Sequence, residues 1–518
     1  MPEQIKALIF ILAMTLPILV IARTVLGGKV IPIEDLDRRF KAWIGILMSA
    51  FLARNFWLYI AISGALMLWA ASKDKNPLAV FLGLFFVVPP TATYIPGFGP
   101  INYIIEIHHL RLASLIILGG LYLRLRKEKL VEPYGFYMLD WLVLSYLALQ
   151  VILSLRSDPT ITTVFRTSVE LFIDGFLPYF VTSRAARNIA ALRDIFVSFL
   201  LAILLMAPIT IFELGKGWLL FTSINEGLGL GWDIMPYIMR NGNVRPYAAT
   251  GNSLVLGFVL AVGLGLYPAI RPLMNIRTWQ WSCGLLIAAL CASLARGSYI
   301  GAAAAVLVAA GSGRGAASRL SKLALIAGFA FIGVLLSPFS EKVASYLPFI
   351  GDVDTDNVTY RTRLFDVSMQ VISMNPLFGS ANFMQEPLMQ QMRQGQGIID
   401  IVNSYLGVAL GLGYVGLSIY FFIYIASLVK IWSSIRQSMN NSLELEGIGR
   451  ALLGTVVGVM VIIATTSCYL SMPFVIWILI GISVRYSGVV ASMAQPTHRE
   501  ASAVRSVKQG YRQSQGKI

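Results

Sequence analysis

The sequence is short of charged residues and of cysteine. Only 13% of its 518 residues are charged, whereas a soluble domain carries about a quarter. The three cysteines, Cys283, Cys291 and Cys468, lie in apolar runs and show no disulfide or metal-ligand spacing, and the three histidines add none. These shortages exclude a soluble enzyme, a disordered chain and a disulfide-rich secreted domain.

One acidic segment resembles a cation-binding loop in its spacing. Asp352, Asp354 and Asp356 alternate along the chain as the ligands of a calcium loop do. The glycine and the terminal glutamate that such a loop needs are missing at the required offsets. The spacing therefore weighs against a metal site.

Apolar residues are abundant instead. They make up 57% of the 518 residues, or about 295 positions, and the mean hydropathy is +0.72. A helix needs about 20 apolar residues to cross a bilayer, so this supply is enough for roughly 14 spans. The apolar residues form long runs rather than short alternating segments, which favours helices over a β-barrel. The sequence predicts an all-α polytopic membrane protein with about 12–14 transmembrane helices.

We expect a transmembrane domain over residues 1–486 that is interrupted by two long loops. The expected spans are 5–24, 56–72, 77–95, 108–124, 137–155, 163–182, 190–213, 249–269, 278–295, 297–312, 322–338, 402–429, 451–467 and 470–486. The loops are 213–250 and 339–401, and long loops that are not linkers are usually functional. A basic tail, 487–518, is expected to be disordered in the cytoplasm.

The net charge of +15 has a ready explanation in a membrane protein. Positive residues gather in cytoplasmic loops, so no nucleic-acid partner is needed to explain them. With fourteen spans and both termini in the cytoplasm, most basic clusters lie inside. Arg38, Arg39, Lys41 and Arg54 break the pattern because they fall outside. A further span near 42–54 would change their side.

Three arginines lie where the topology does not need them. Arg245 and Arg296 adjoin apolar spans, and Arg361 opens a helical stretch of the second long loop. A guanidinium near the membrane interior costs about 3 kcal/mol or more, so it usually faces a cavity and a partner. Its planar fork matches phosphate oxygens. The arginines either form an outer anion site for a lipid-linked pyrophosphate, or each snorkels to the interface or pairs with an acidic neighbour.

A second polar stripe consists of Arg166, Glu170 and Asp174. Their spacing of four residues places all three on one helical face. They form either a ladder of salt bridges that neutralises itself or part of the wall of a polar cavity.

The second half of the chain contains a series of short motifs. In chain order they are Glu213 at a span end, Arg245 followed by Gly251-Asn252, Ala295-Arg296-Gly297, Arg361-x-x-Leu364-Phe365, Asn375-Pro376-Leu377-Phe378-Gly379, Asn403-Ser404-Tyr405-Leu406 and Gly411-Leu-Gly-Tyr-Val-Gly416. Their order and spacing resemble those of the O-antigen ligase and O-antigen polymerase superfamily of bacterial polysaccharide assembly.

The resemblance implies a GT-C-type glycosyltransferase at the periplasmic face of the bacterial inner membrane. Its donor would be a glycan on undecaprenyl pyrophosphate, and it would need no nucleotide sugar, metal or other cofactor. Arg245, Arg296 and Arg361 would stabilise the negative charge that develops on the leaving group. Membrane lipids and other proteins of polysaccharide assembly and export would be its partners.

The remaining candidate site residues follow from the same motifs and from the polar stripe. Glu213, Asn252, Asn403 and Arg166 are the candidate substrate-binding residues. Asp400 is the candidate catalytic base.

One position departs from the family pattern. Val402 stands where the family has a histidine, to which the ligase branch assigns a catalytic role. The departure leaves the general base to Asp400, with Glu386 as the alternative. It favours a polymerase of repeat units over a ligase that transfers glycan to lipid A core or to protein. A flippase or transporter of lipid-linked glycan is the non-enzymatic alternative.

Overall fold

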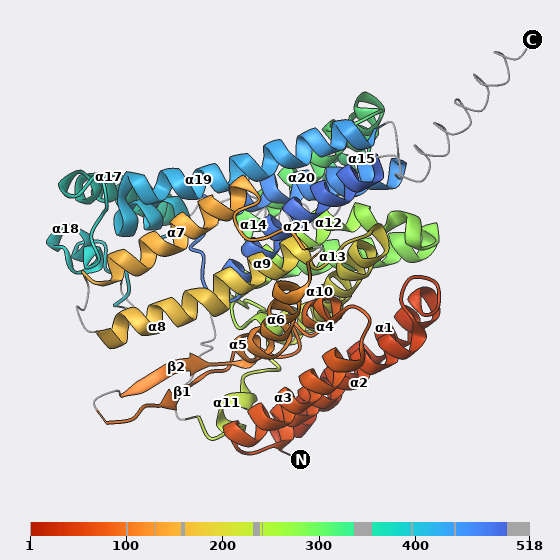
Figure 1. Cartoon of the computed structure of the whole chain (residues 1–518), viewed down its shortest axis with the longest axis horizontal. Helices are drawn as coiled ribbons and strands as arrows, with labels where there is room; N and C mark the ends of the chain where they lie inside the picture. The colour runs from red at the N-terminus through yellow and green to blue at the C-terminus, as the bar shows by residue number, and fades with distance from the viewer. Residues whose placement is uncertain are drawn as a thin grey trace, which may run out of the picture.

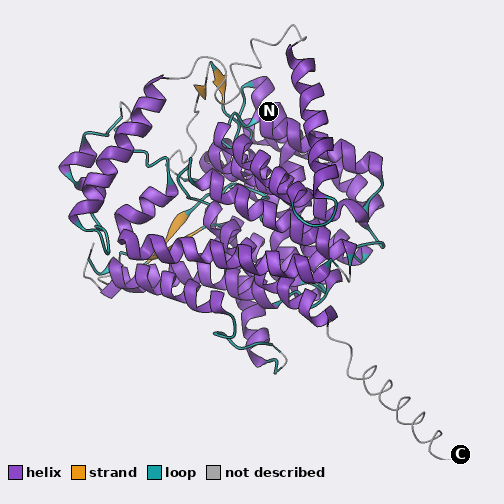
Figure 2. Cartoon of the chain, turned by 90° about the horizontal axis from the view of Figure 1, so that it is seen from above, coloured by secondary structure: helices purple, strands orange, loops and turns teal. Residues whose placement is uncertain are grey.

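The computed structural model describes residues 2–99, 102–129, 131–156, 161–230, 239–240, 242–335, 355–394, 397–439 and 442–494. Asp352, Asp354 and the tail beyond residue 494 lie outside the described residues. Helices packed side by side make up the described chain, together with two small hairpins (Figures 1 and 2). The expected all-α polytopic fold is confirmed.

The chain forms its helices and strands in the following order. The elements are α1 (Glu3–Leu26), α2 (Ile33–Leu52), α3 (Phe56–Lys73), α4 (Pro77–Gly83), β1 (Thr93–Pro96), β2 (Tyr103–Ile107), α5 (His109–Ala113), η1 (Ser114–Leu118), α6 (Gly119–Lys127), α7 (Met138–Ser154), α8 (Ile161–Leu171), η2 (Phe172–Phe176), α9 (Leu177–Arg184), α10 (Ile189–Lys216), α11 (Ser223–Gly227), β3 (Met239–Arg240), β4 (Asn243–Val244), η3 (Ala248–Thr250), α12 (Ser253–Leu266), η4 (Tyr267–Leu273), α13 (Ile276–Ala292), α14 (Arg296–Gly311), α15 (Ala316–Leu335), α17 (Thr355–Met374), η5 (Phe383–Gln385), α18 (Pro387–Gln390), α19 (Ser404–Ser438), α20 (Leu443–Ile463) and α21 (Met472–Ala494).

Seven of these elements are long and apolar enough to cross a membrane within the described chain: α1, α3, α10, α12 with η4, α19, α20 and α21. Each coincides with an expected span. The shorter apolar helices α7 and α14 coincide with two more. Helix α21 continues to Ala494, beyond the expected end of the transmembrane domain at residue 486.

The two ends of the helices are named here the loop face and the tail face. The loop face is the end at which α11, the β1–β2 hairpin, α17 and α18 lie, and the tail face is the end at which α21 finishes (Figure 1). The N-terminus lies at the loop face, because Glu3 accepts a hydrogen bond from Trp218 (3.0 Å) and Gln4 donates one to the carbonyl of Ser223 (3.3 Å). The start of α1 and the end of α21 therefore lie at opposite faces (Figure 1), whereas the sequence predicted both termini on one side.

The difference arises at α2, which lies between the first two expected spans and runs back toward the loop face (Figure 1), although it is not among the seven described helices that are long and apolar enough to cross a membrane. The sequence offered it only as a further span near 42–54. Because α2 starts at the tail face, Arg39 lies near Asp74, which follows the end of α3, and near Asp194, at the start of α10. Arg39 is ion-paired with both carboxylates. Arg38, Arg39 and Lys41, in the first half of α2, thus lie toward the tail face, whereas Arg54 follows the end of α2 at Leu52 and lies toward the loop face.

This topology predicts opposite labelling of two single cysteines in a variant whose three native cysteines are replaced by serine. Pro2→Cys, at the loop face, is expected to react with a membrane-impermeant maleimide in intact spheroplasts. Lys75→Cys, the matched exposed control at the tail face, is expected to react only after permeabilisation. Labelling of both sites under the same condition would contradict the assignment.

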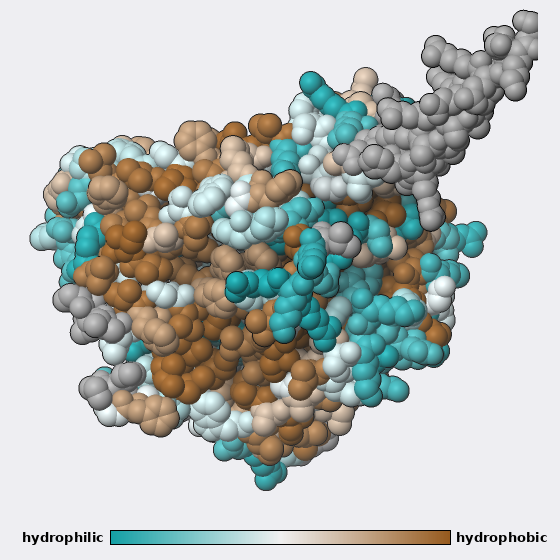
Figure 3. Space-filling model, in the orientation of Figure 1, coloured by the Kyte–Doolittle hydropathy of each residue, from teal (hydrophilic) through white to brown (hydrophobic). Residues whose placement is uncertain are grey.

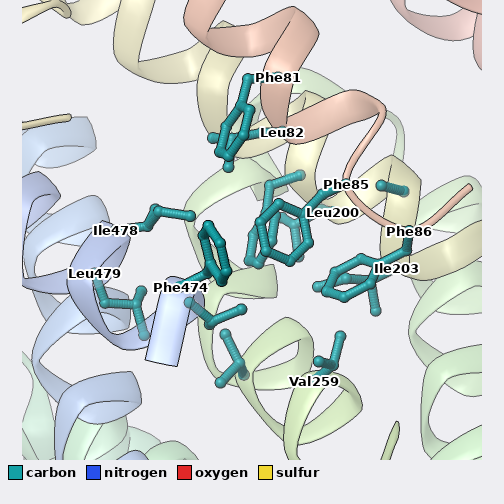
Figure 4. Close-up of a cluster of buried hydrophobic side chains, with 14 of the residues drawn as sticks. Phe81, Leu82, Phe85, Phe86, Leu200, Ile203, Val259, Phe474, Ile478 and Leu479 are labelled. Atoms are coloured by element: carbon teal, nitrogen blue, oxygen red, sulfur yellow. The ribbon is translucent and has the colours of Figure 1, made fainter. Parts of the chain in front are cut away.

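The expected span 77–95 is helical only in its first half. Helix α4 ends at Gly83, and the irregular chain that follows it is buried within the protein. Non-helical backbone is tolerated at membrane depth only where protein surrounds it. Figure 4 shows how this segment contributes to the core: Phe81, Leu82, Phe85 and Phe86 pack against Leu200, Ile203, Val259, Phe474, Ile478 and Leu479.

Candidate functional site

The candidate site begins where α10 ends and α12 begins, at the loop face. Glu213, near the end of α10, is completely buried. Its carboxylate accepts hydrogen bonds from the backbone N–H groups of Leu220 (3.1 Å), Tyr247 (3.1 Å) and Ala248 (2.9 Å). Because buried carboxylates need such partners, Glu213 acts to hold two loops together. The sequence predicted a substrate contact for Glu213, and the structure places its carboxylate on these three backbone N–H groups.

Arg245 lies two residues before this anchored segment, and its guanidinium forms no salt bridge with any described residue. Its Nε and Nη2 atoms are buried, and no described residue accepts a hydrogen bond from either atom. The β3–β4 hairpin, which pairs Arg240 with Asn243, places a second arginine within electrostatic range. Burial first, and then the like charge of Arg240, lower the pKa of Arg245 to about 10, so the side chain stays charged at neutral pH.

The surroundings of Arg245 suit an anion. The described groups that raise the pKa of Arg245 are the phenol side chains of Tyr469 and Tyr299, which are neutral when protonated. Burial raises the pKa of Tyr469, so its hydroxyl keeps its proton and can donate a hydrogen bond. A buried guanidinium that lacks a carboxylate is costly unless a ligand supplies the negative charge.

Arg361 and the start of α14 both contact the connection between α20 and α21. Arg361, on α17, donates a hydrogen bond to the carbonyl oxygen of Thr465 at 3.4 Å. Arg296 opens α14, and the next residue, Gly297, packs so closely on the Thr465 hydroxyl that a Cβ would not fit. Arg296 therefore starts its helix beside the residue that Arg361 contacts.

Asp400 links this group to Arg245. Its carboxylate accepts a hydrogen bond from the Ser467 hydroxyl at 3.2 Å. It also acts electrostatically on Arg361 and on Tyr469. Since Tyr469 interacts electrostatically with Arg245 as well, the chain between α20 and α21 connects the Asp400 carboxylate with Arg245 and Arg361, which come from two separate segments.

Strained backbone gathers around the same residues. In the described chain, four non-glycine residues have a positive φ, and three of them are Ala248 (φ 44°), Leu294 (φ 54°) and Leu470 (φ 52°). Ala248 belongs to the segment bonded to Glu213. Leu294 lies two residues before the start of α14, and Leu470 follows Tyr469. Such conformations cost about 1–3 kcal/mol each and tend to cluster at functional sites.

The motifs of the large loop interlock with a break in α19. Gly413 has φ 66° and interrupts the helix. The backbone N–H groups that the break frees, on Tyr414 and Val415, donate to the carbonyls of Pro376 (2.8 Å) and Leu377 (3.1 Å). The loop thus satisfies donors that would otherwise be buried without a partner.

Gly379 and Arg156 complete the interlock. Gly379 has φ 65°, and a Cβ there would overlap the Leu410 carbonyl. Arg156, beyond the end of α7, donates to the carbonyl oxygens of Gly379 (2.7 Å), Phe378 (2.9 Å) and Gly411 (3.2 Å). The glycines of both motifs therefore shape the loop that carries Arg361 and Asp400.

Asn252 and Asn403 are helix caps. The side chain of Asn252 accepts a hydrogen bond from the backbone N–H of Leu254 (2.8 Å), and Asn403 accepts one from that of Tyr405 (2.9 Å). An asparagine cap fixes where a helix starts, so Asn252 and Asn403 set the starts of α12 and α19. Val402, at the position of the family histidine, packs against the apolar core of the large loop.

The second polar stripe does not form an internal ladder. Arg166 stacks 3.7 Å from the ring centroid of Tyr103 and donates to its carbonyl oxygen (3.1 Å). Glu170 and Asp174 instead pair with Arg111, at 3.2 and 2.7 Å. The structure thus places Arg166 on the β1–β2 hairpin, apart from the contacts that join Arg245, Arg361 and Asp400.

Sequence reasoning missed Arg240, Tyr299 and Tyr469. Arg240 stands in a loop without a motif, and a tyrosine near a span end is ordinarily read as an interfacial anchor. Only the proximity of Tyr299 to Arg296 in the sequence could have drawn attention to it.

A comparison with known protein families finds a match in the region from α13 to α19. Residues 281–421 match a family model described as O-antigen ligase. This region contains Arg296, Arg361, Asp400 and Asn403, whereas Arg245 lies before it. The resemblance inferred from the motifs is confirmed here. None of the curated proteins compared with the chain matches it.

Proposed function

From the match of residues 281–421 to the O-antigen ligase model, we propose that this membrane protein is a polysaccharide polymerase. It joins glycan repeat units that are carried on undecaprenyl pyrophosphate. The reaction takes place at the loop face, which is the periplasmic side of a bacterial inner membrane. The C-terminal end of α21 is then cytoplasmic and the N-terminus periplasmic.

The observation that carries this proposal is the unpaired guanidinium of Arg245. It is buried beside Arg240, and the described residues supply no hydrogen-bond acceptor to its Nε or Nη2. A diphosphate offers several acceptor oxygens in the geometry that a guanidinium fork prefers. The hydroxyl of Tyr469 is a further donor for such an anion.

The proposed step forms one bond and breaks another. An acceptor sugar hydroxyl attacks the anomeric carbon of the donor, the bond between that carbon and the phosphate oxygen breaks, and undecaprenyl pyrophosphate leaves. Arg245, Arg296 and Arg361 stabilise the negative charge that grows on the leaving group. Asp400 accepts the proton of the attacking hydroxyl, and Ser467 holds the carboxylate in place.

Asp400 suits the role of base better than Glu386 does. The Tyr360 hydroxyl donates to the carbonyl of Asp400 (3.0 Å) and accepts from its N–H (3.2 Å), which fixes the backbone. Its carboxylate is in electrostatic contact with Arg361. Glu386 lies at the start of the short helix α18.

The experiment uses the purified full chain in nanodiscs with a lipid-linked repeat unit. We expect a ladder of polymer, release of undecaprenyl pyrophosphate and no loss of rate with EDTA. Asp400→Asn should slow transfer by about 10²–10⁴-fold, the usual contribution of a general base, whereas Glu386→Gln should leave it unchanged. Transfer only when lipid A core or a protein acceptor is added would instead establish a ligase. Failure to release undecaprenyl pyrophosphate with any acceptor would contradict the enzymatic proposal.

A further inference from the structure

An apolar groove lies between α7 and α19 on the half of these helices nearer the tail face. Its volume is about 480 Å³, and its lining includes Met138, Leu142, Phe422, Ala426 and Lys430. The surface over α7 is mostly hydrophobic (Figure 3). Farther toward the loop face the two helices close, because the rings of Tyr146 and Tyr420 meet at 5.2 Å.

A single cation interrupts the apolar lining. The Lys430 ammonium lies 4.5 Å from the ring centroid of Tyr137, at the start of α7. Within the described chain no carboxylate forms a salt bridge with it. Asp140 acts on Lys430 electrostatically, but its carboxylate is bonded to Arg184 at 2.7 Å.

The surroundings decide what can occupy the groove. An aliphatic lining that faces a bilayer is filled by lipid chains rather than by water, because the lining offers water too few polar partners. The lone ammonium near the tail face, next to an interfacial tyrosine, attracts a negatively charged head group. The occupant must therefore combine an acyl chain with an anionic phosphate at the level of Lys430.

We propose that this groove binds an anionic phospholipid from the leaflet at the tail face. Its phosphate pairs with Lys430, and one acyl chain lies between Leu142 and Phe422. The lipid holds α7 against α19, and α7 leads to Arg156, which fastens the large loop. The lipid-linked donor does not fit this position, because its pyrophosphate belongs at the loop face.

Native mass spectrometry of the delipidated full chain provides the test, with phosphatidylglycerol and phosphatidylcholine of identical acyl chains. One basic residue near a membrane contributes about 1 kcal/mol, which corresponds to about fivefold in affinity. We expect wild type and Lys430→Arg to bind phosphatidylglycerol about fivefold more tightly than phosphatidylcholine. Lys430→Gln should lose this preference, whereas Lys322→Gln, an exposed lysine on α15 outside the groove, should keep it.

A second variant fills the groove without touching the charge. Ala426→Trp should reduce binding of both lipids, and it keeps the proposal testable if Lys430→Gln fails to fold. Equal affinity for the two lipids in wild type, or an unchanged preference in Lys430→Gln, would overturn the proposal. Displacement of phosphatidylglycerol by undecaprenyl phosphate would assign the groove to the donor instead and would also overturn it.

Discussion

Arg245→Gln is expected to lower the rate of glycan transfer by about 10²–10³-fold, the usual cost of removing one preorganised donor to a developing oxyanion. The same change should not lower thermal stability. Arg245 has two buried nitrogen atoms to which no described residue offers an acceptor. Removal of this charge therefore relieves an unfavourable burial in the ligand-free protein, and the melting temperature should rise by a few degrees.

The sign of this effect follows from the pKa of Arg245. Folding lowers it from the ordinary arginine value to about 10, so the folded chain binds the proton less tightly than the unfolded chain. A basic group with a lowered pKa costs stability at every pH below the folded pKa, and the cost disappears as the pH rises from about 10 toward the ordinary pKa of arginine. A bound anion should reverse the shift. Inorganic pyrophosphate is therefore expected to raise the melting temperature of wild type but not of Arg245→Gln.

Two further variants make this result specific. Arg245→Lys keeps the charge but loses the fork, so its rate should fall between those of wild type and Arg245→Gln. Arg393→Gln removes an exposed arginine of the large loop whose guanidinium contacts Gln390, and it should leave both rate and stability unchanged. A large drop in the melting temperature of Arg245→Gln would show that the arginine is structural, and the anion site would have to be abandoned.

The sequence predicted the membrane class and most helices correctly because long apolar runs report directly on burial in lipid. It offered α2 only as a further span near 42–54, for a physical reason. The first half of α2 carries Asp35, Arg38 and Arg39, and a hydropathy window sees these as a loop. Their charges are neutralised by partners that are close only in the folded chain, such as Asp194 on α10.

The candidate site likewise contains residues that the sequence singled out and residues that it missed. Arg245 and Arg361 stood out because a guanidinium beside an apolar span needs an explanation. Asn252 and Asn403 stood out equally, yet a simpler principle accounts for them: an asparagine before an apolar run is a favoured helix cap. Tyr469 gave no signal at all, because only the packing of α20 and α21 brings it to Arg245.

The glycine motifs clarify what the family resemblance measures. Residues 375–379 and 411–416 carry much of it, and the structure uses them to fit the large loop into the break in α19. The resemblance thus reports on the scaffold that presents Arg361 and Asp400. The identity of the acceptor depends on side chains outside these motifs, which is why polymerase and ligase activity must be separated by their products.

Arg39→Ala is expected to destabilise the protein by about 3–5 kcal/mol, the usual cost of breaking a buried ion pair. Arg39 is 5% exposed and donates to both oxygens of Asp74, each at 2.8 Å, and to Asp194. Its loss leaves two buried carboxylates without a counter-charge. The loss of helical signal in a denaturant titration of the full chain in mild detergent would measure this effect.

The matched control is Arg23→Ala, because Arg23 forms the same two-bond contact with Asp37 (2.6 and 2.9 Å) but in solvent-exposed surroundings. Exposed pairs contribute about 0–1 kcal/mol, so this variant should unfold almost as wild type does. Adding Asp74→Asn to Arg39→Ala should recover part of the loss, since one orphaned charge is then removed. Equal unfolding of the two arginine variants would contradict the buried cluster. Because Arg39 lies at the tail face and the proposed site at the loop face, the folded fraction of Arg39→Ala should keep the transfer rate of wild type, which separates stability from catalysis in this chain.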